Sequence, residues 1–371
     1  MKNIVIDVIG SFSDGKTTLV KALTNETTLR HSEEAKYGMT IRLGYAHFTI
    51  YKNKSSFSLK EGEPYMNVSV IDSPGHQQLL SIMISGASIV DGAILVVAAN
   101  KNIQMQAIEH LQTIKKIGIK NLVVAQSKID IVSKERAIES YKEIRDLLDK
   151  EGYNNARIIP VFAAQNINIE ELLSEIAKFE KPEEEGSLIM PIVRSFDVNR
   201  PGTKISKIKG AVIGGGIKRG KLKVGDKIKI LPAINFEGKE VELHSEVEEI
   251  QSEFGEEKEV ERGKTIGVLT KLDPSLSRND ELAGRVLVSE NEEIEYTNKI
   301  SLEGEVKDLE KDETVLLHIL SMRFGGRIIN KKENLVEIAL DRKIPYFKGE
   351  TALVSKRINN TWVLVTGLKC E

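Results

Sequence analysis

The stretch Gly10-Ser-Phe-Ser-Asp-Gly15-Lys16-Thr17 decides the fold of the N-terminal half of this chain. Its two glycines bracket four residues and precede a lysine and a threonine, which is the G-x-x-x-x-G-K-[ST] spacing of a phosphate-binding loop. An apolar run over 4–9 comes before it, and a helical pattern over 16–23 follows. The alternative is a chance match in a glycine-containing turn, and the strand-loop-helix context argues against it.

In such a loop, backbone amides converge on a phosphate at the N-terminus of a helix, where the helix dipole favours anions. We expect Lys16 to bridge the terminal phosphates of a nucleotide and the Thr17 hydroxyl to ligate Mg²⁺. The residues expected to contact the nucleotide in this stretch are Gly10, Ser13, Asp14, Gly15, Lys16, Thr17 and Thr18.

Outward from the loop, apolar runs alternate with amphipathic stretches through about residue 180. This alternation predicts an α/β domain, a mostly parallel sheet with helices on both faces. The predicted strands are 4–9, 68–71, 93–98, 122–125 and 158–161. The predicted helices are 16–23, 77–85, 104–117, 134–150 and 169–179.

The second half of the chain has a different pattern. A segment with a proline, a glycine and a charge run, 180–186, is typical of a linker. Beyond it, short alternating segments separated by glycine and proline predict β-barrels. We divide the chain into a nucleotide-binding domain (1–184) and two β-barrel domains (185–289 and 290–371), with the last boundary at the polar run Glu290-Asn-Glu-Glu.

The amino-acid composition limits which partners and which cellular compartment we expect. The 53 Lys and Arg residues nearly balance the 55 Asp and Glu residues. The overall charge therefore gives no pull toward DNA, and local patches must hold any RNA partner. The single cysteine, Cys370, excludes a disulfide or a cysteine metal site within one chain. No apolar run approaches the ~20 residues of a membrane span, so we expect a cytoplasmic protein without a membrane partner.

Two further motifs fit a nucleotide switch. Asp72-Ser-Pro-Gly75-His76 follows the strand 68–71, at the sheet edge where ligands of such folds bind. We expect Asp72 to hold Mg²⁺ through water, the Gly75 amide to approach the terminal phosphate, and His76 to orient the attacking water. The alternative is an ordinary turn whose aspartate caps a helix.

Thr40, in the run Tyr37-Gly-Met-Thr40-Ile41, is the candidate for the second switch. A threonine that closes on Mg²⁺ and the terminal phosphate makes an order-disorder switch. The alternative is a threonine at the start of a strand.

The motif Ser127-Lys128-Ile129-Asp130 favours guanine. The Asp130 carboxylate can accept hydrogen bonds from guanine N1–H and from the 2-amino group, a donor pair that adenine lacks, and the Lys128 stem can cover the base. Asparagine is usual in place of Ser127 and reaches further toward the phosphate loop, so we expect weaker affinity. A surface lysine and aspartate at a helix start are the alternative. After the last strand, an amide for guanine O6 is expected from Ala163, Ala164 and Gln165.

Together these stretches resemble the gamma subunit of archaeal and eukaryotic translation initiation factor 2, a translational GTPase family. The strongest match is His31-Ser-Glu-Glu-Ala-Lys-Tyr-Gly38-Met-Thr40-Ile-Arg-Leu-Gly44-Tyr-Ala46. The segments 85–100, 191–203, 210–217 and 270–284 match as well. The resemblance is dense through about residue 290 and thin beyond it.

The resemblance implies a GTPase domain and two β-barrels, with GTP or GDP and Mg²⁺ as cofactors. It implies that the chain binds methionylated initiator tRNA, delivers it to the small ribosomal subunit, and releases it on GTP hydrolysis. It also implies a heterotrimer with alpha and beta subunits. In relatives, the alpha subunit docks on the first barrel, and the tRNA acceptor end lies between that barrel and the GTPase domain. Lys16, Thr40, Gly75 and His76 would carry catalysis.

The sequence departs from the family at several positions, and two alternative functions stay open. Relatives usually carry Gly-His-Val-Asp-His-Gly-Lys-Thr in the phosphate loop, whereas Ser13 here lacks the carboxylate and Asp14 adds negative charge, which predicts slow or differently tuned hydrolysis. Many relatives also carry a cysteine zinc knuckle, but 52–63 contains no cysteine, so no zinc is expected. The alternatives are an elongation-type carrier of selenocysteine or general aminoacyl-tRNA, and a GTP-bound scaffold that holds partner subunits without hydrolysis.

Overall fold

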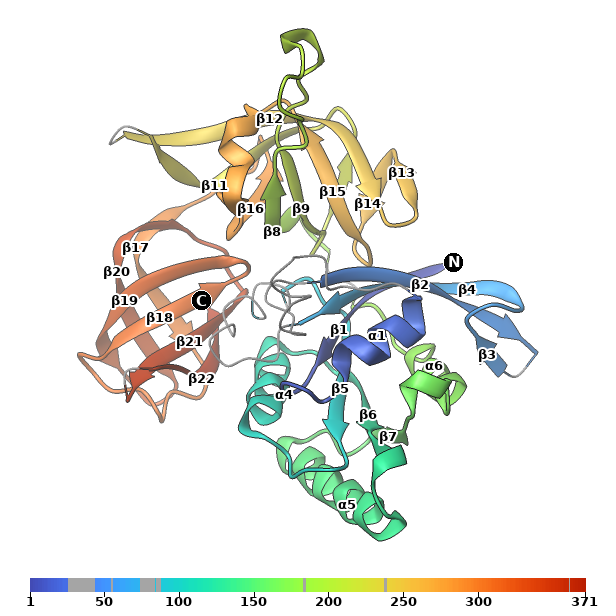
Figure 1. Cartoon of the computed structure of the whole chain (residues 1–371). Coiled ribbons are helices and arrows are strands. Elements are labelled where there is room, and N and C mark those ends of the chain that lie inside the picture. The colour runs from blue at the N-terminus through green and yellow to red at the C-terminus, as the bar shows by residue number, and fades with distance from the viewer. Residues whose placement is uncertain are drawn as a thin grey trace. The chain divides into compact units, whose positions relative to one another are not determined.

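The computed structural model describes residues 1–25, 44–54, 56–73, 84, 88–182, 185–236, 239–359 and 361–371. The chain divides into two compact units, Met1–Glu183 and Glu184–Glu371. Figure 1 shows the N-terminal unit in blue to green and the C-terminal unit in yellow-green to red.

The N-terminal unit is built on one seven-stranded sheet in the order β3-β2-β4-β1-β5-β6-β7. Strands β4, β1, β5, β6 and β7 run parallel, whereas β2 is antiparallel to β4 and β3 is antiparallel to β2. The five predicted strands form the parallel part, and the antiparallel edge, β2 and β3, was not predicted. The bounds are β1 (Lys2–Ile9), β2 (Gly44–Asn53), β3 (Ser56–Ser58), β4 (Glu63–Asp72), β5 (Gly92–Ala98), β6 (Asn121–Ser127) and β7 (Arg157–Pro160).

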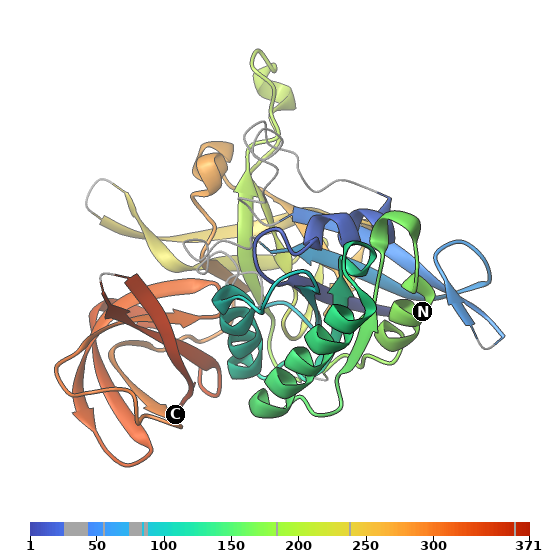
Figure 2. The ribbon, with the colours of Figure 1, turned by 60° about the horizontal axis from the view of Figure 1, so that its bottom comes forward.

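The helices of this unit are α1 (Lys16–Thr24), α4 (Met105–Ile117), α5 (Lys134–Glu151) and α6 (Ile169–Ile176). Helices α1 and α6 cover one face of the sheet, and α4 and α5 cover the other (Figures 1 and 2). One apolar cluster lies between the first face and its two helices. In it, alternate residues of β1 such as Ile6 pack with Leu19 of α1 and Leu173 of α6. The predicted helix 77–85 lies almost wholly outside the described residues.

The first barrel of the C-terminal unit closes in the order β11-β16-β8-β9-β15-β12, with β11 pairing back to β12. Strand β13 extends β12, and β10 pairs with β14 in a separate ribbon. The bounds are β8 (Ile189–Phe196), β9 (Val212–Gly216), β10 (Lys221–Lys223), β11 (Lys227–Phe236), β12 (Lys239–Ser252), β13 (Gly255–Glu257), β14 (Glu259–Glu261), β15 (Thr265–Thr270) and β16 (Arg285–Ser289).

The second barrel is closed in the order β17-β20-β19-β18-β21-β22. One apolar cluster runs from this barrel to Leu231 and Val286 of the first barrel, so the two barrels share part of their core. The carboxylate of Glu350 also lies 3.3 Å from Lys218 Nζ. The bounds are β17 (Tyr296–Glu303), β18 (Thr314–Ile319), β19 (Met322–Lys331), β20 (Leu335–Pro345), β21 (Thr351–Ile358) and β22 (Thr361–Cys370).

These elements confirm the predicted fold class, a mostly parallel α/β domain followed by two β-barrels. None of the helices in the described parts of the chain has the length and apolar character that crossing a membrane requires.

Candidate nucleotide-binding site

The phosphate loop connects β1 to α1 at the carboxyl edge of the parallel sheet, and its backbone turns in the left-handed region at three residues. The φ angles are 141° at Gly10, 59° at Ser13 and 94° at Gly15. A Cβ added to Gly10 would lie 2.3 Å from the backbone oxygen of Val96 in β5. Only glycine fits there without moving backbone, so the loop shape depends on that residue.

Lys16 lies inside the curve of its own loop. Its ammonium donates to the backbone oxygens of Gly10 at 3.0 Å and Ser11 at 2.9 Å. Burial lowers the pKa of Lys16, and the carboxylates of Asp72 and Asp14 oppose that shift. Two carbonyl groups therefore hold this lysine inside the loop, where the motif predicts that it contacts a phosphate.

Thr17 and Asp72 supply oxygen atoms beside Lys16. The Thr17 hydroxyl donates to Asp72 Oδ2 at 2.9 Å, and Asp72 is the last residue of β4, the strand paired with β1. Hydroxyl and carboxylate oxygens are the donors that Mg²⁺ prefers. The residues present therefore fit the expected metal.

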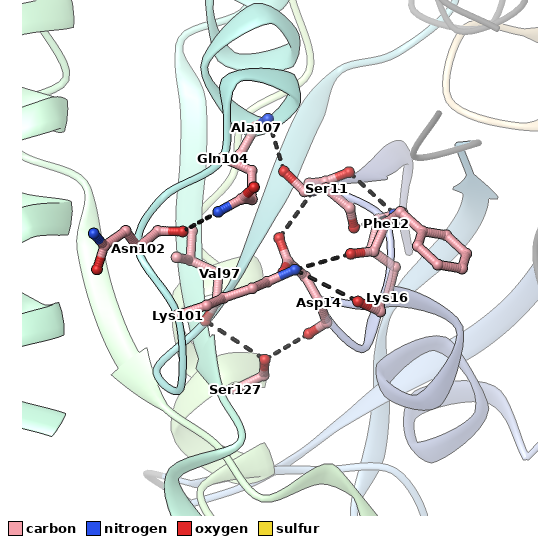
Figure 3. Close-up of polar contacts among 12 residues, drawn as sticks. Ser11, Phe12, Asp14, Lys16, Val97, Lys101, Asn102, Gln104, Ala107 and Ser127 are labelled. Carbon is pink, nitrogen blue, oxygen red and sulfur yellow. Dashed lines mark hydrogen bonds and ion pairs between the residues drawn. The ribbon is translucent and has the colours of Figure 1, made fainter. Parts of the chain in front are cut away.

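Ser127, the last residue of β6, reaches the phosphate loop although it is shorter than asparagine. Its hydroxyl donates to the backbone oxygen of Asp14 at 2.5 Å. A tie between the predicted base-recognition motif (127–130) and the loop is therefore present with serine in place of asparagine, and Figure 3 shows it. The weaker affinity expected from Ser127 stays a prediction. Lys128 follows with φ 57°, and Asp130 is exposed on a short 3₁₀ helix, η2 (Ile129–Ile131).

The residues expected to approach guanine O6 form another 3₁₀ helix, η3 (Ala163–Gln165), shortly after β7. Strand β7 is the parallel neighbour of β6. The motif after β6 and the segment after β7 therefore emerge from the same edge of the sheet. Thr18, the remaining expected contact, is exposed on α1.

The Asp14 carboxylate turns into the loop and is paired there. Its Oδ2 accepts from the Ser11 amide at 2.9 Å, and its Oδ1 lies 2.8 Å from Lys101 Nζ. Only 3% of this side chain is exposed. The negative charge that the sequence adds to the loop thus meets a counter-charge from the segment after β5 (Figure 3).

Three residues that support the loop were not predicted: Ser11, Lys101 and His110. The Ala107 amide in the first turn of α4 donates to Ser11 Oγ at 3.1 Å, and the Gly10 amide donates to His110 Nδ1 at 3.3 Å. Burial lowers the pKa of His110 to about 3, and the charge of Lys16 contributes. The one available sequence signal was the position of Lys101, just after a buried parallel strand.

Thr40, Gly75 and His76 lie outside the described residues. Their assignment to the switch and to catalysis stays a prediction. The assignments of the other residues to GTP and Mg²⁺, and the expected absence of zinc, also stay predictions.

Family comparisons cover most of the chain. Residues 1–182 match the sequence model of the "Elongation factor Tu GTP binding domain". Residues 210–278 match "Elongation factor Tu domain 2", and residues 287–367 match "Initiation factor eIF2 gamma, C terminal". The likeness to that factor therefore continues into the second barrel, where the motifs gave little sign of it.

Curated relatives match over nearly their full length. The chain is 36% identical to translation initiation factor 2 subunit gamma of Archaeoglobus fulgidus, over 98% of this chain and 93% of that protein. It is 38% identical to the subunit of the same name from Sulfurisphaera tokodaii, over 97% of this chain and 96% of that protein.

Solved structures with the same fold include elongation factors. A bacterial selenocysteine-specific elongation factor, EF-Sec, superposes with a TM-score of 0.84 at 26% identity, over 100% of this chain and 58% of that one. Translation elongation factor SelB of Methanococcus maripaludis, in complex with the GTP analogue GppNHp, superposes with a TM-score of 0.79 at 22% identity, over 100% of this chain and 79% of that one.

Proposed function

Because this chain belongs to the gamma-subunit family of translation initiation factor 2, we propose that it carries methionylated initiator tRNA to the small ribosomal subunit and releases it on GTP hydrolysis. The observation that supports this most strongly is that the family resemblance extends through both barrels as well as the nucleotide domain. A shared GTPase domain alone would not separate initiation from other steps of translation.

The nucleotide site suggests how the chain holds GTP. Lys16 and the amides of the loop 10–15 bind the phosphates, and Asp130 selects guanine through its paired donors. Thr17 and Asp72 would hold Mg²⁺, which supplies positive charge against the phosphates when it is bound. His76 orients the attacking water, and Thr40 and Gly75 close on the terminal phosphate in the GTP state only.

The first barrel offers a surface for a partner subunit. The segment between β8 and β9, 197–211, contains a short 3₁₀ helix, η4 (Ile205–Lys207), and extends away from the barrel (Figure 1). Ile205 is 89% exposed there, with basic neighbours at Arg200, Lys204, Lys207 and Lys209. Val198 and Ile208 of the same segment are 44% and 46% exposed. A group of exposed apolar residues of this kind supports docking of the alpha subunit on this barrel. A beta subunit would complete the heterotrimer.

Binding of tRNA by the full chain tests the proposal. The purified chain, loaded with GDP or a non-hydrolysable GTP analogue, is titrated with methionylated initiator tRNA and with an elongator aminoacyl-tRNA. We expect tight binding of the initiator in the GTP state only, with the elongator at least about tenfold weaker. Preference for the elongator would contradict the proposal.

The second candidate is an elongation-type carrier. The observation that favours it is the superposition on the selenocysteine-specific elongation factor over the whole of this chain. Competition between selenocysteinyl-tRNA and initiator tRNA separates the two functions. Preference for selenocysteinyl-tRNA would support the elongation-type carrier.

A scaffold that binds GTP without hydrolysis is separated by a single-turnover assay on small ribosomal subunits. We expect GTP to turn over there and the substitution His76→Ala to slow it markedly, with nucleotide affinity close to that of the unmodified chain. Absence of turnover in the unmodified chain would support the scaffold. Turnover that the substitution leaves unchanged would remove His76 from the mechanism.

We also propose a cytoplasmic location, where initiation takes place. We propose domain boundaries at 184/185 and 289/290 from the composition of the linker 180–186 and the polar run 290–293.

A further inference from the structure

We propose that Lys101 is a positioning residue of the nucleotide site, which neutralises Asp14 and holds the phosphate loop in the shape that receives the phosphates. Its ammonium lies 2.8 Å from Asp14 Oδ1, donates to the backbone oxygen of Phe12 at 3.0 Å, and lies 3.5 Å from Ser13 Oγ. These contacts cover the stretch in which the loop departs from its relatives. The proposal rests on GTP binding by this loop and is independent of tRNA carriage.

The charge of Asp14 makes a counter-charge necessary. Its side chain is 3% exposed, in a loop whose ligand carries two or three phosphates. An uncompensated buried carboxylate is costly by itself, and it also repels an anionic ligand. The Ser11 amide partners one carboxylate oxygen, but it carries no full charge. Lys101 supplies that charge to the other oxygen.

The backbone of the segment that carries Lys101 is itself fixed by hydrogen bonds from helix α5. Arg136 of α5 donates to the backbone oxygens of Ala99 at 3.1 Å and Lys101 at 3.2 Å. Its guanidinium is paired in turn with Glu139 and Glu143, each at 2.8 Å. Lys101 therefore projects from a fixed backbone and not from a free loop.

The same segment is joined to the base-recognition strand, because the Ala99 amide donates to the backbone oxygen of Ser127 at 2.9 Å. Two contacts thus converge on Asp14: the Ser127 hydroxyl on its carbonyl group and the Lys101 ammonium on its carboxylate. A loop fixed at both points loses little further freedom when a nucleotide binds, and such preorganisation raises affinity.

A double-mutant cycle in the full chain tests the proposal. Dissociation constants for fluorescent GDP and GTP are measured for the unmodified chain, Lys101→Ala, Asp14→Asn, and the pair combined. We expect Lys101→Ala to weaken both nucleotides about tenfold when Asp14 is present, and less than about threefold when Asp14→Asn has already removed the charge. Lys115→Ala is the matched control, because Lys115 forms a similar ion pair with Glu151, at 3.2 Å, in the same unit.

Two results would overturn the proposal. The first is that Lys101→Ala binds both nucleotides with unchanged affinity. The second is that Lys101→Ala loses tenfold in affinity both with Asp14 and with Asp14→Asn. That result would indicate a general structural defect, because such a defect would not depend on the Asp14 charge. If Lys101→Ala does not fold, Lys101→Gln keeps the stem and removes only the charge, and the same cycle applies. Initiator tRNA binding is scored separately, so a chain that binds GTP but no tRNA refutes tRNA carriage and leaves the role of Lys101 standing.

Discussion

The hydroxyl of Ser127 donates a 2.5 Å hydrogen bond to the backbone oxygen of Asp14, which joins the base-recognition motif to the phosphate loop. Both residues depart from the family pattern, yet they meet. Ser127 is 9% exposed, and the Ser127 side chain is the nearest group, at 3.7 Å, to a Cβ built on Gly15. A small side chain thus makes the contact in a confined space.

Ser127→Ala is expected to release bound GDP faster. The substitution removes the hydroxyl and leaves the Asp14 carbonyl buried without this donor, a loss worth about 1 kcal/mol, or roughly fivefold in affinity. Stopped-flow release of a fluorescent GDP measures it. The control is Ser140→Ala, because the Ser140 hydroxyl in α5 is also buried but has no hydrogen-bond partner among the described residues. Equal release rates for both variants would contradict the prediction.

Asp130→Asn is expected to change base selectivity. The amide presents one donor and one acceptor in place of two acceptors, so it loses the bond to the guanine 2-amino group and gains one to an oxygen at that position. We expect GDP affinity to fall at least about tenfold and xanthosine diphosphate to bind better than it does to the unmodified chain. Competition against fluorescent GDP measures both. A variant that still prefers guanine would argue against Asp130 as the selecting residue.

The sequence predicted the parts of this site that depend on residues close together along the chain, and it missed those that depend on residues far apart. Gly10, Gly15 and Lys16 were found because eight consecutive residues specify the loop, and the buried parallel strands were found because they read as unbroken apolar runs. Lys101 and His110 were missed because each acts on the loop from about 90 to 100 positions away, through contacts that no local spacing records. Strand β2 was missed because only alternate residues of it are apolar and buried, so it forms no unbroken apolar run, and because it follows directly on a polar segment.

Gly10→Ala is expected to destabilise the N-terminal unit severely. The added Cβ would lie 2.3 Å from the Val96 backbone oxygen, and the φ of 141° strains any residue with a side chain. We expect a loss above about 3 kcal/mol. Gly152→Ala is the matched control, because its φ of 82° is also positive but no neighbouring atom in the described part of the chain lies within 4 Å of the added atom. That change should cost only about 1 kcal/mol. Chemical denaturation compares the two, and equal losses would contradict the packing argument.

Ile205→Asp is expected to weaken binding of the alpha subunit while the barrel stays folded. The residue is 89% exposed, so the substitution removes no core contact, whereas a charge in an apolar contact with a partner typically costs more than about 2 kcal/mol, or thirtyfold in affinity. Calorimetric titration with purified alpha subunit measures it. Val224→Asp, at a 45% exposed position elsewhere on the barrel, is the control. Unchanged affinity in Ile205→Asp would place the docking surface elsewhere.

His110 and His318 are expected to make the protein less stable in acid. Burial lowers the pKa of His110 to about 3 and that of His318 to about 4, from an ordinary value of 6.5. Below pH 6.5 these two side chains therefore bind protons in the unfolded chain, whereas in the folded chain they stay neutral. The full free energy of unfolding is present above pH 6.5, and it falls as the pH drops toward the pKa values of the folded chain. At about pH 5 each histidine has lowered it by about 2 kcal/mol.

The substitution His110→Asn tests this in the N-terminal unit, because the asparagine carbonyl can still accept from the Gly10 amide but does not titrate in this range. We expect its free energy of unfolding to fall less between about pH 7 and pH 5 than that of the unmodified chain. His318→Asn should act in the same way in the C-terminal unit. The prediction is wrong if the double variant His110→Asn/His318→Asn keeps the same pH dependence as the unmodified chain. Other groups, such as paired carboxylates, would then cause the loss of stability in acid.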